Sequence, residues 1–152
     1  MAVAMELARI LIRETDDMHI VELREVGVTG RDPRVFPIVI GLTEAAAIER
    51  RLMGQAPPRP QTHELTADII GQLGYAIDRV VISDLQHDEL NRGTFFARLH
   101  LRPSGEGGEI VDVDARPSDA IALGVAYEVP IDVEEHVLDM VCGPLGGDGN
   151  VA

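Results

Sequence analysis

Two acidic residues, Glu44 and Asp119, stand near the start of predicted helices and could share a divalent metal ion. They occupy matching stretches, residues 40–45 and 115–120, in which a hydroxyl residue and then an acid precede alanine. A carboxylate in the first turn complements the helix dipole by roughly 0.3–1 kcal/mol, which is the simpler explanation of each acid alone. If the two helix starts meet in the fold, the carboxylates could bind Mg²⁺ or Mn²⁺, and the helix N-termini could bind phosphate.

A second pair of acids, Asp112 and Asp114, lies two residues apart on a predicted strand, so both side chains project from one face. Arg98 and His100 likewise share one face of the preceding predicted strand. Cross-strand charge pairs on a solvated sheet face explain these four residues most simply. They could also form a carboxylate pair for Mg²⁺ or Mn²⁺ with an arginine and a histidine close by.

Residues 50–63 are the best candidate for a phosphate-facing segment, because they include Arg50, Arg51 and Arg59 and no acid. Guanidinium groups bind phosphate through paired hydrogen bonds. The simpler explanation is that Arg50 and Arg51 complement the dipole at a helix C-terminus. His63 follows a proline-rich connector at the start of a helix, where it could act as a general base or as a structural hydrogen-bond donor.

The composition limits what kind of site is possible. The 152 residues carry a net charge of −13 and no lysine, so passive electrostatic binding to nucleic acid is disfavoured. A nucleic-acid role therefore needs a local arginine cluster, a bridging metal ion, or both. One cysteine excludes an internal disulfide, and we expect a reducing, cytoplasmic setting. No segment is long and apolar enough to span a membrane. The sequence contains neither a dinucleotide-binding motif nor a phosphate loop, so we expect no organic cofactor.

Hydrophobic periodicity predicts strands, helices and a tail. Pro37 should place the third strand at a sheet edge or a bulge. The helix over residues 62–74 should bury Leu65, Ile69 and Leu73, and the last helix should begin at Asp132. The expected strands span residues 6–13, 18–26, 35–40, 76–85, 94–101 and 109–114; the expected helices span residues 43–53 with a Thr43 cap, 62–74, 117–127 and 132 onward; and residues 143–152 should be disordered.

The order of these elements predicts one α+β domain over residues 1–142. A strand–strand–strand–helix unit occurs twice, at about residues 5–54 and 76–127. The interpretation is a duplicated βββα unit, with a mixed or antiparallel sheet at the core and helices packed outside.

Three stretches in order resemble the bifunctional nuclease family: residues 36–45, 58–65 and 115–123, within a similarity that runs from about residue 5 to 141. The resemblance implies an α+β fold with internal duplication, self-association, and activity on both RNA and DNA without marked base specificity. The family's motif positions here are Glu44, His63, Arg116, Ser118 and Asp119. Glu64 departs from the pattern, which usually has aspartate after the motif histidine.

These observations lead to a metal-assisted nuclease hypothesis. Glu44 and Asp119 would hold the ion, His63 would activate water, and Arg116 and Arg59 would stabilise the phosphate. The alternative is a non-catalytic oligomeric scaffold, or a regulatory or ligand-binding protein. Convergence of the motif side chains in one pocket would favour the nuclease, whereas dispersed or ion-paired side chains would favour the scaffold.

Overall fold

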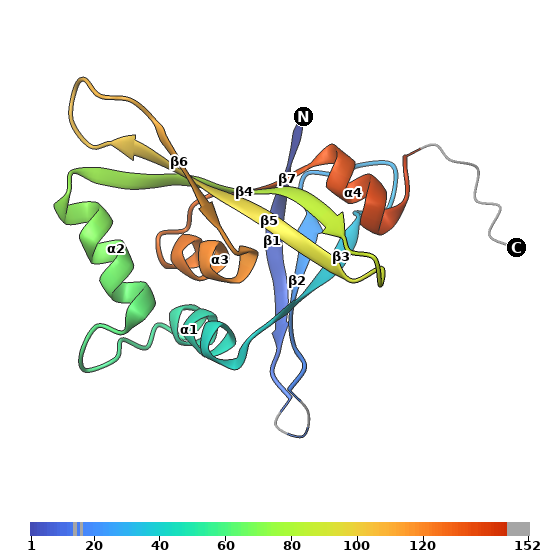
Figure 1. Cartoon of the computed structure of the whole chain (residues 1–152), viewed down its shortest axis with the longest axis horizontal. Coiled ribbons are helices and arrows are strands. Elements are labelled where there is room, and N and C mark those ends of the chain that lie inside the picture. The colour runs from blue at the N-terminus through green and yellow to red at the C-terminus, as the bar shows by residue number, and fades with distance from the viewer. Residues whose placement is uncertain (14, 16, 146–152) are drawn as a thin grey trace, which may run out of the picture.

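The structure, a computed structural model, describes residues 1–13, 15 and 17–145. Its elements confirm the α+β class (Figure 1). In chain order they are β1 (Ala2–Leu11), β2 (His19–Glu25), β3 (Val35–Ile40), α1 (Leu42–Leu52), α2 (Thr62–Gln72), β4 (Tyr75–His87), β5 (Gly93–Pro103), β6 (Val111–Ala115), α3 (Pro117–Ala126), β7 (Ile131–Glu134) and α4 (Glu135–Cys142). Among these helices, none is long and apolar enough to cross a membrane.

One mixed sheet contains all of these strands, in the order β3-β2-β1-β7-β4-β5-β6. Strands β1 to β3 form one antiparallel meander and β4 to β6 form another. Strand β7 joins them, since it is antiparallel to β1 and parallel to β4. The edge position of β3 agrees with Pro37, which has no N–H to donate to a further strand. The order βββα occurs twice along the chain, while descent from a duplication stays a prediction.

The prediction of a last helix beginning at Asp132 is wrong, because residues 131–134 form strand β7. Ile131 and Val133 are buried and alternate with partly exposed acids, which is the periodicity of a strand. The capping-box spacing between Asp132 and Glu135 therefore does not mark a helix start here, and α4 begins at Glu135 itself.

The predicted burial of Leu65, Ile69 and Leu73 on α2 is also wrong. These side chains are 51%, 49% and 73% exposed. Helix α2 instead turns its other face, which carries the buried His63 and Ala67, toward α3 and β4. Helical spacing identifies a common face, but it does not show which face the rest of the protein covers.

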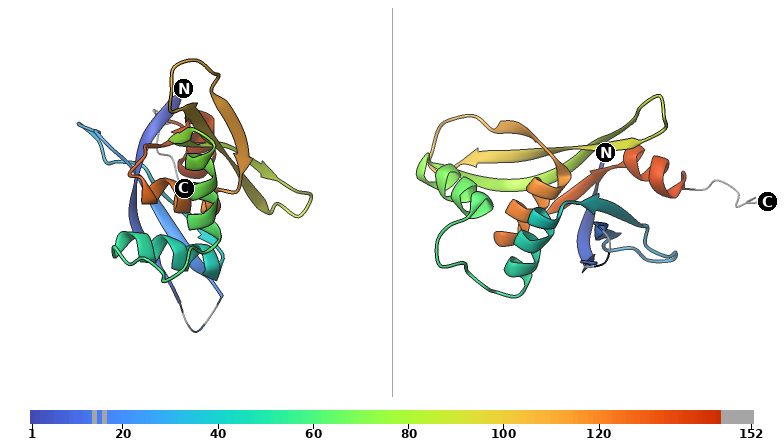
Figure 2. Two further views of the ribbon diagram at one scale, coloured as in Figure 1. Left: turned by 90° about the vertical axis from the view of Figure 1, so that its left-hand side faces the viewer. Right: turned by 60° about the horizontal axis from the view of Figure 1, so that its bottom comes forward.

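Helices α1, α2 and α3 lie together on one side of the strongly twisted sheet, whereas α4 lies apart from them beside β3 and β4 (Figures 1 and 2). Phe36 on β3 stacks on Phe95 on β5 with ring centroids 5.9 Å apart, although β2, β1, β7 and β4 lie between those strands in the sheet. The sheet must therefore curl around one hydrophobic core.

Gly124 lets α3 approach β4, because a Cβ there would lie 3.0 Å from Cγ2 of Val80.

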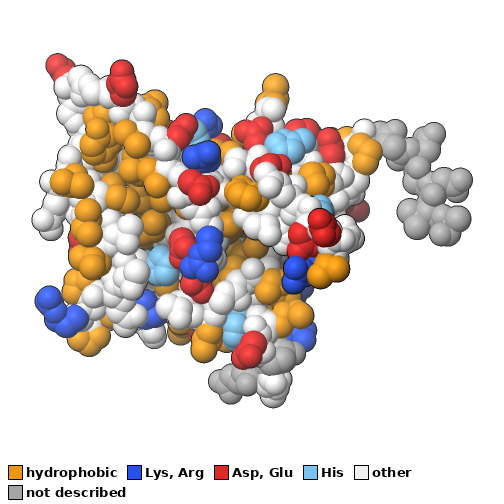
Figure 3. Space-filling view, in the orientation of Figure 1, with side chains coloured by type: hydrophobic (Ala, Val, Ile, Leu, Met, Phe, Trp, Pro, Cys, Tyr) orange, Lys and Arg blue, Asp and Glu red, His pale blue; other side chains and the backbone are white. Residues whose placement is uncertain are grey.

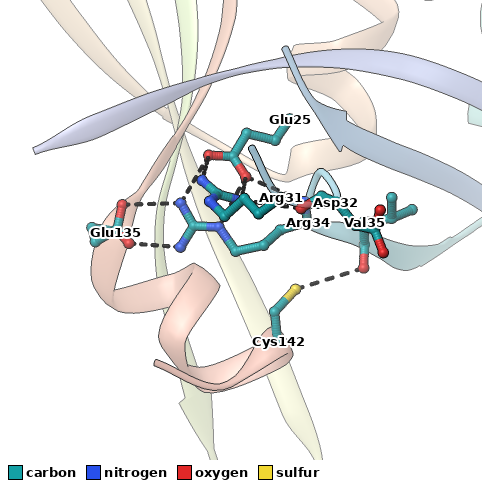
Figure 4. A network of polar contacts seen from close by, with 7 residues as sticks. All are labelled: Glu25, Arg31, Asp32, Arg34, Val35, Glu135 and Cys142. Atoms are coloured by element: carbon teal, nitrogen blue, oxygen red, sulfur yellow. Dashed lines mark hydrogen bonds and ion pairs between the residues drawn. The ribbon is translucent and has the colours of Figure 1, made fainter. Parts of the chain in front are cut away.

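A buried ion-pair network fastens α4 to the first meander (Figure 4). The Glu25 carboxylate accepts hydrogen bonds from Arg31 at 2.8 and 3.0 Å and from the Arg34 guanidinium at 3.0 Å, and Arg34 Nη1 donates to Glu135 Oε1 at 2.6 Å. Hydrogen bonds from Arg31 and then Arg34 hold the pKa of Glu25 far below its ordinary value. At the other end of α4, the Cys142 thiol donates to the Val35 carbonyl at 3.6 Å.

Replacing Glu25 with glutamine is expected to lower the free energy of unfolding by about 3 kcal/mol near neutral pH, because it removes the buried carboxylate that pairs with Arg31 and Arg34 and leaves buried Arg34 with Glu135 alone. The folded state lowers the pKa of Glu25, so its contribution is complete above the ordinary pKa and is lost as the pH falls. The native protein should therefore lose more stability than the variant between about pH 5 and pH 3. Urea unfolding at several pH values measures both effects.

Glu6→Gln is the matched control. Glu6 pairs with Arg24, and both side chains are 47% exposed, so the expected loss is below about 1 kcal/mol. Equal losses in the two variants would contradict the role assigned to the buried network.

Candidate active site

The first turns of α1 and α3 meet through Arg116, which precedes α3. Its Nη2 donates to Glu44 Oε1 at 2.7 Å and to Asp119 Oδ1 at 3.1 Å, and its Nε donates to Asp119 Oδ2 at 2.8 Å. Glu44 and Asp119 therefore come together, which is the arrangement that the shared-site alternative requires, and one guanidinium lies between them. None of these three bonds uses Nη1, and the Arg116 side chain is 63% exposed.

His63 joins the same cluster from the first turn of α2. Its Nε2 lies 3.0 Å from Asp119 Oδ1, and its side chain is 11% exposed. In the tautomer that donates from Nε2 to Asp119, the other ring nitrogen, Nδ1, is free to accept a proton. A histidine oriented by a carboxylate in this way has the arrangement of a general base.

Each charged group of the cluster stabilises the charged form of its neighbours. Hydrogen bonding from Arg116 is the main cause that lowers the pKa of Glu44. Burial alone would raise the pKa of Asp119, but hydrogen bonds from Arg116 and His63 outweigh it, so the net pKa is lowered. The two carboxylates in turn raise the pKa of Arg116. Both acids are therefore ionised at neutral pH and act as acceptors.

Gly41 determines where the Glu44 carboxylate lies. The structure corrects the predicted Thr43 cap, because α1 begins at Leu42 and Gly41 is the N-cap residue. A Cβ on Gly41 would overlap Oε2 of Glu44. The side chain of Glu44 thus folds back over the helix start, into space that only glycine leaves free.

The cluster borders a cavity of about 430 Å³ on the helical side of the sheet. In Figure 3, acidic, basic and histidine side chains gather where α1, α2 and α3 meet. Three threonines supply hydroxyl groups around the cavity, and apolar side chains of β5, β6 and α3 line the rest. Besides the four charged or histidine residues of the cluster, the lining comprises Thr43, Thr62, Thr66, Leu99, Val113, Asp114, Ala115 and Leu123.

Sequence reasoning missed most of this lining. Thr62 and Thr66 are four residues apart on a helix that begins beside His63, and this spacing was a usable signal for a common face. Leu99, Val113 and Leu123 carried no such signal, because they look like ordinary core residues in the sequence.

Ser118 and Asp112 lie outside this cavity. Ser118 is buried and lines a separate cavity of about 230 Å³ with residues of β3 and β5. Asp112 contacts His100 Nδ1 at 2.6 Å, on the sheet face opposite Leu99 and Val113. Asp114 borders the His63 cavity and is paired with Arg98 in the strand register.

The three arginines of residues 50–63 have different surroundings. Arg50 donates to Glu64 Oε1 at 3.3 Å, and Arg51 Nε lies 3.9 Å from the same oxygen. Burial would raise the pKa of Glu64, but a backbone hydrogen bond and then Arg50 lower it overall. Arg59 is exposed and makes no ion pair with any residue that the structure describes.

The motif residues of the cluster are engaged with one another in this structure. The Arg116 guanidinium occupies the space between Glu44 and Asp119 where a shared ion would lie. Within residues 1–13, 15 and 17–145, no group of three or more histidine, cysteine or acidic side chains could hold a metal ion.

Comparison with known proteins identifies the family. The bifunctional nuclease domain matches residues 26–144. A Mycobacterium tuberculosis protein, whose name says only that it is uncharacterized, is 40% identical over 129 residues, which cover 85% of this chain and 70% of the relative. Bifunctional nuclease 1 of Oryza sativa subsp. indica is 28% identical and bifunctional nuclease 2 of Arabidopsis thaliana 26%, each over 68% of this chain and 30% of the relative. Since the domain match covers most of its length, the chain belongs to the bifunctional nuclease domain family.

Proposed function

We propose that this protein is a nuclease that hydrolyses phosphodiester bonds in RNA or DNA with little base specificity. The observation that carries the proposal is the cluster of His63, Asp119, Arg116 and Glu44 at the border of one cavity. Family membership and the names of the plant relatives support it. The net charge of −13 makes this local arginine more important, because the chain as a whole repels a polyanion.

In the proposed reaction, His63 Nδ1 removes a proton from water while Asp119 holds the ring through Nε2. The water oxygen attacks phosphorus, the bond to the leaving oxygen breaks, and that oxygen takes a proton from the protonated His63 or from solvent. Arg116 Nη1, free of the three ion-pair bonds, faces the negative charge of five-coordinate phosphorus. Arg59 on the exposed connector guides the neighbouring phosphates.

Assistance by a divalent ion is a separate part of the proposal. Glu44 and Asp119 cannot hold an ion between them while Arg116 lies there. No step of the reaction above therefore runs through a metal.

A non-catalytic oligomeric scaffold is the second candidate. The observation that favours it is that the same ion pairs engage every charged group of the cluster, as caps and interhelical contacts would. We include self-association in both proposals, and the exposed Leu65, Ile69 and Leu73 on α2 support it.

Asp119→Asn and His63→Ala are each expected to reduce cleavage of labelled single-stranded RNA and DNA at least roughly 100-fold, because they remove the base or its orienting partner. Circular dichroism should remain that of the native fold. Asp68→Asn is the matched control, since it removes the same charge from an exposed position on α2 and should leave the rate unchanged. Full activity in both site variants would overturn the assignment, and no cleavage by the native protein would favour the scaffold.

Gly41→Ala is expected to lower the cleavage rate roughly 10- to 100-fold, because the added methyl group displaces the Glu44 carboxylate from Arg116. Gly105→Ala, at a loop position where a Cβ meets no atom within 4 Å, should be neutral. Equal rates in the two variants would show that the position of Glu44 does not matter for catalysis.

The proposed assistance by a divalent ion is tested by repeating the assay in EDTA and then with added Mg²⁺ or Mn²⁺. If the ion assists, EDTA should abolish cleavage and either metal should restore it in the native protein but not in Glu44→Gln. Undiminished cleavage in EDTA would rule the ion out and leave the metal-free reaction.

A further inference from the structure

A further cavity, of about 370 Å³, shares no lining residue with the His63 cavity. It lies where the end of α2, the start of β4 and the turn from α3 to β7 come together. Tyr75 and Tyr127, the only two tyrosines of the chain, both line it. We call it the tyrosine cavity; its other polar lining residues are Asp78, Arg102 and Glu128.

Glu128 has an unusual backbone conformation at this cavity. It is the second residue after α3 and has φ of +52°, in the left-handed region that favours glycine. The corresponding residues after α1 and α2 are Gly54, with φ of +67°, and Gly74, with φ of +86°. Glutamate therefore stands where helix termination alone would favour glycine, and such strained residues are concentrated at functional sites.

Gly71, the penultimate residue of α2, also lines the cavity. No close contact requires glycine there, because a Cβ would meet no heavy atom within 4 Å. The missing side chain instead leaves the tyrosine cavity open.

The charges of the cavity select a cation. Asp78 is already paired with Arg102, whose Nε lies 3.2 Å from Asp78 Oδ1. Glu128 forms no ion pair within the described part of the chain, so its carboxylate is the one charge of the lining left unneutralised. Tyrosine rings attract cations through their faces, and the acidic protein as a whole adds to the attraction.

We propose that the tyrosine cavity binds a small organic cation, a protonated primary amine on an apolar body. The ammonium group pairs with Glu128, and the apolar part lies among Tyr75, Tyr127 and the open wall at Gly71. This site is independent of the proposed nuclease reaction.

Tyrosine fluorescence tests the proposal directly, because the chain has no tryptophan and both tyrosines line the cavity. The full-length protein is titrated with benzylamine, and with benzyl alcohol as a neutral molecule of similar size, at constant ionic strength. Benzylamine is expected to give a saturable change, with benzyl alcohol bound at least about tenfold more weakly.

Three variants separate binding from folding. Glu128→Gly should unfold at a higher temperature than the native protein, because it relieves the strained backbone, and yet bind benzylamine at least about tenfold more weakly. Gly71→Leu should retain the native circular dichroism and lose binding by filling the cavity. Glu106→Gln, which removes one charge from an exposed loop, should bind like the native protein.

Three results would overturn the proposal. They are the absence of a saturable response to benzylamine, equal affinities for the amine and the alcohol, and undiminished binding in Glu128→Gly.

Discussion

The rest of the structure depends on the short strand β7. Its four residues pair with β1 on one side, three of them pair with β4 on the other, and the strand joins two three-stranded meanders into one sheet. Because Val133 and Ile131 are buried there, the junction is also part of the hydrophobic core. Helix α1 follows the first meander and α3 follows the second. With the two meanders joined in one sheet, α1 packs directly on α3, and Glu44 and Arg116, 72 residues apart, come within 2.7 Å.

The sequence predicts the parts of this arrangement that local chemistry determines. Strand β3 has the bounds 35–40 that were predicted, because a short apolar run ends at Gly41. The equivalent places of Glu44 and Asp119 in the first turns of two helices suggest that they could meet, while a role for each acid at its own helix dipole is the simpler interpretation of the sequence. Long-range packing determines what the sequence could not show. The exposure of Leu65 on α2 leaves no local signal, because packing decides which face of a helix is covered. At residues 131–134 the alternation of apolar residues and acids is compatible with a strand, but the pairing with β1 and β4 decides against the helix that the capping-box spacing predicts.

The contact between Gly41 and Glu44 is a second feature that the sequence alone does not predict, here at the scale of single atoms. Glycine before a helix looks like a simple strand terminus in the sequence, and Thr43 is the better cap by residue type. Only the folded backbone reveals that the Glu44 carboxylate takes the space of a Cβ. The geometry of the candidate active site thus depends on a residue with no side chain.

The two arginine networks of this protein contain the same chemical groups but differ in how far they are buried. Arg34 joins Glu25 to Glu135, and Arg116 joins Glu44 to Asp119. The Arg34 side chain is 8% exposed, so releasing either partner would leave a charge away from water, and the network can only be structural. Arg116 is 63% exposed, and water screens its ion pairs. A phosphate can compete for such a guanidinium at modest cost, so two acids around one arginine form a structural network at Arg34, whereas at Arg116 they leave the guanidinium accessible from solvent.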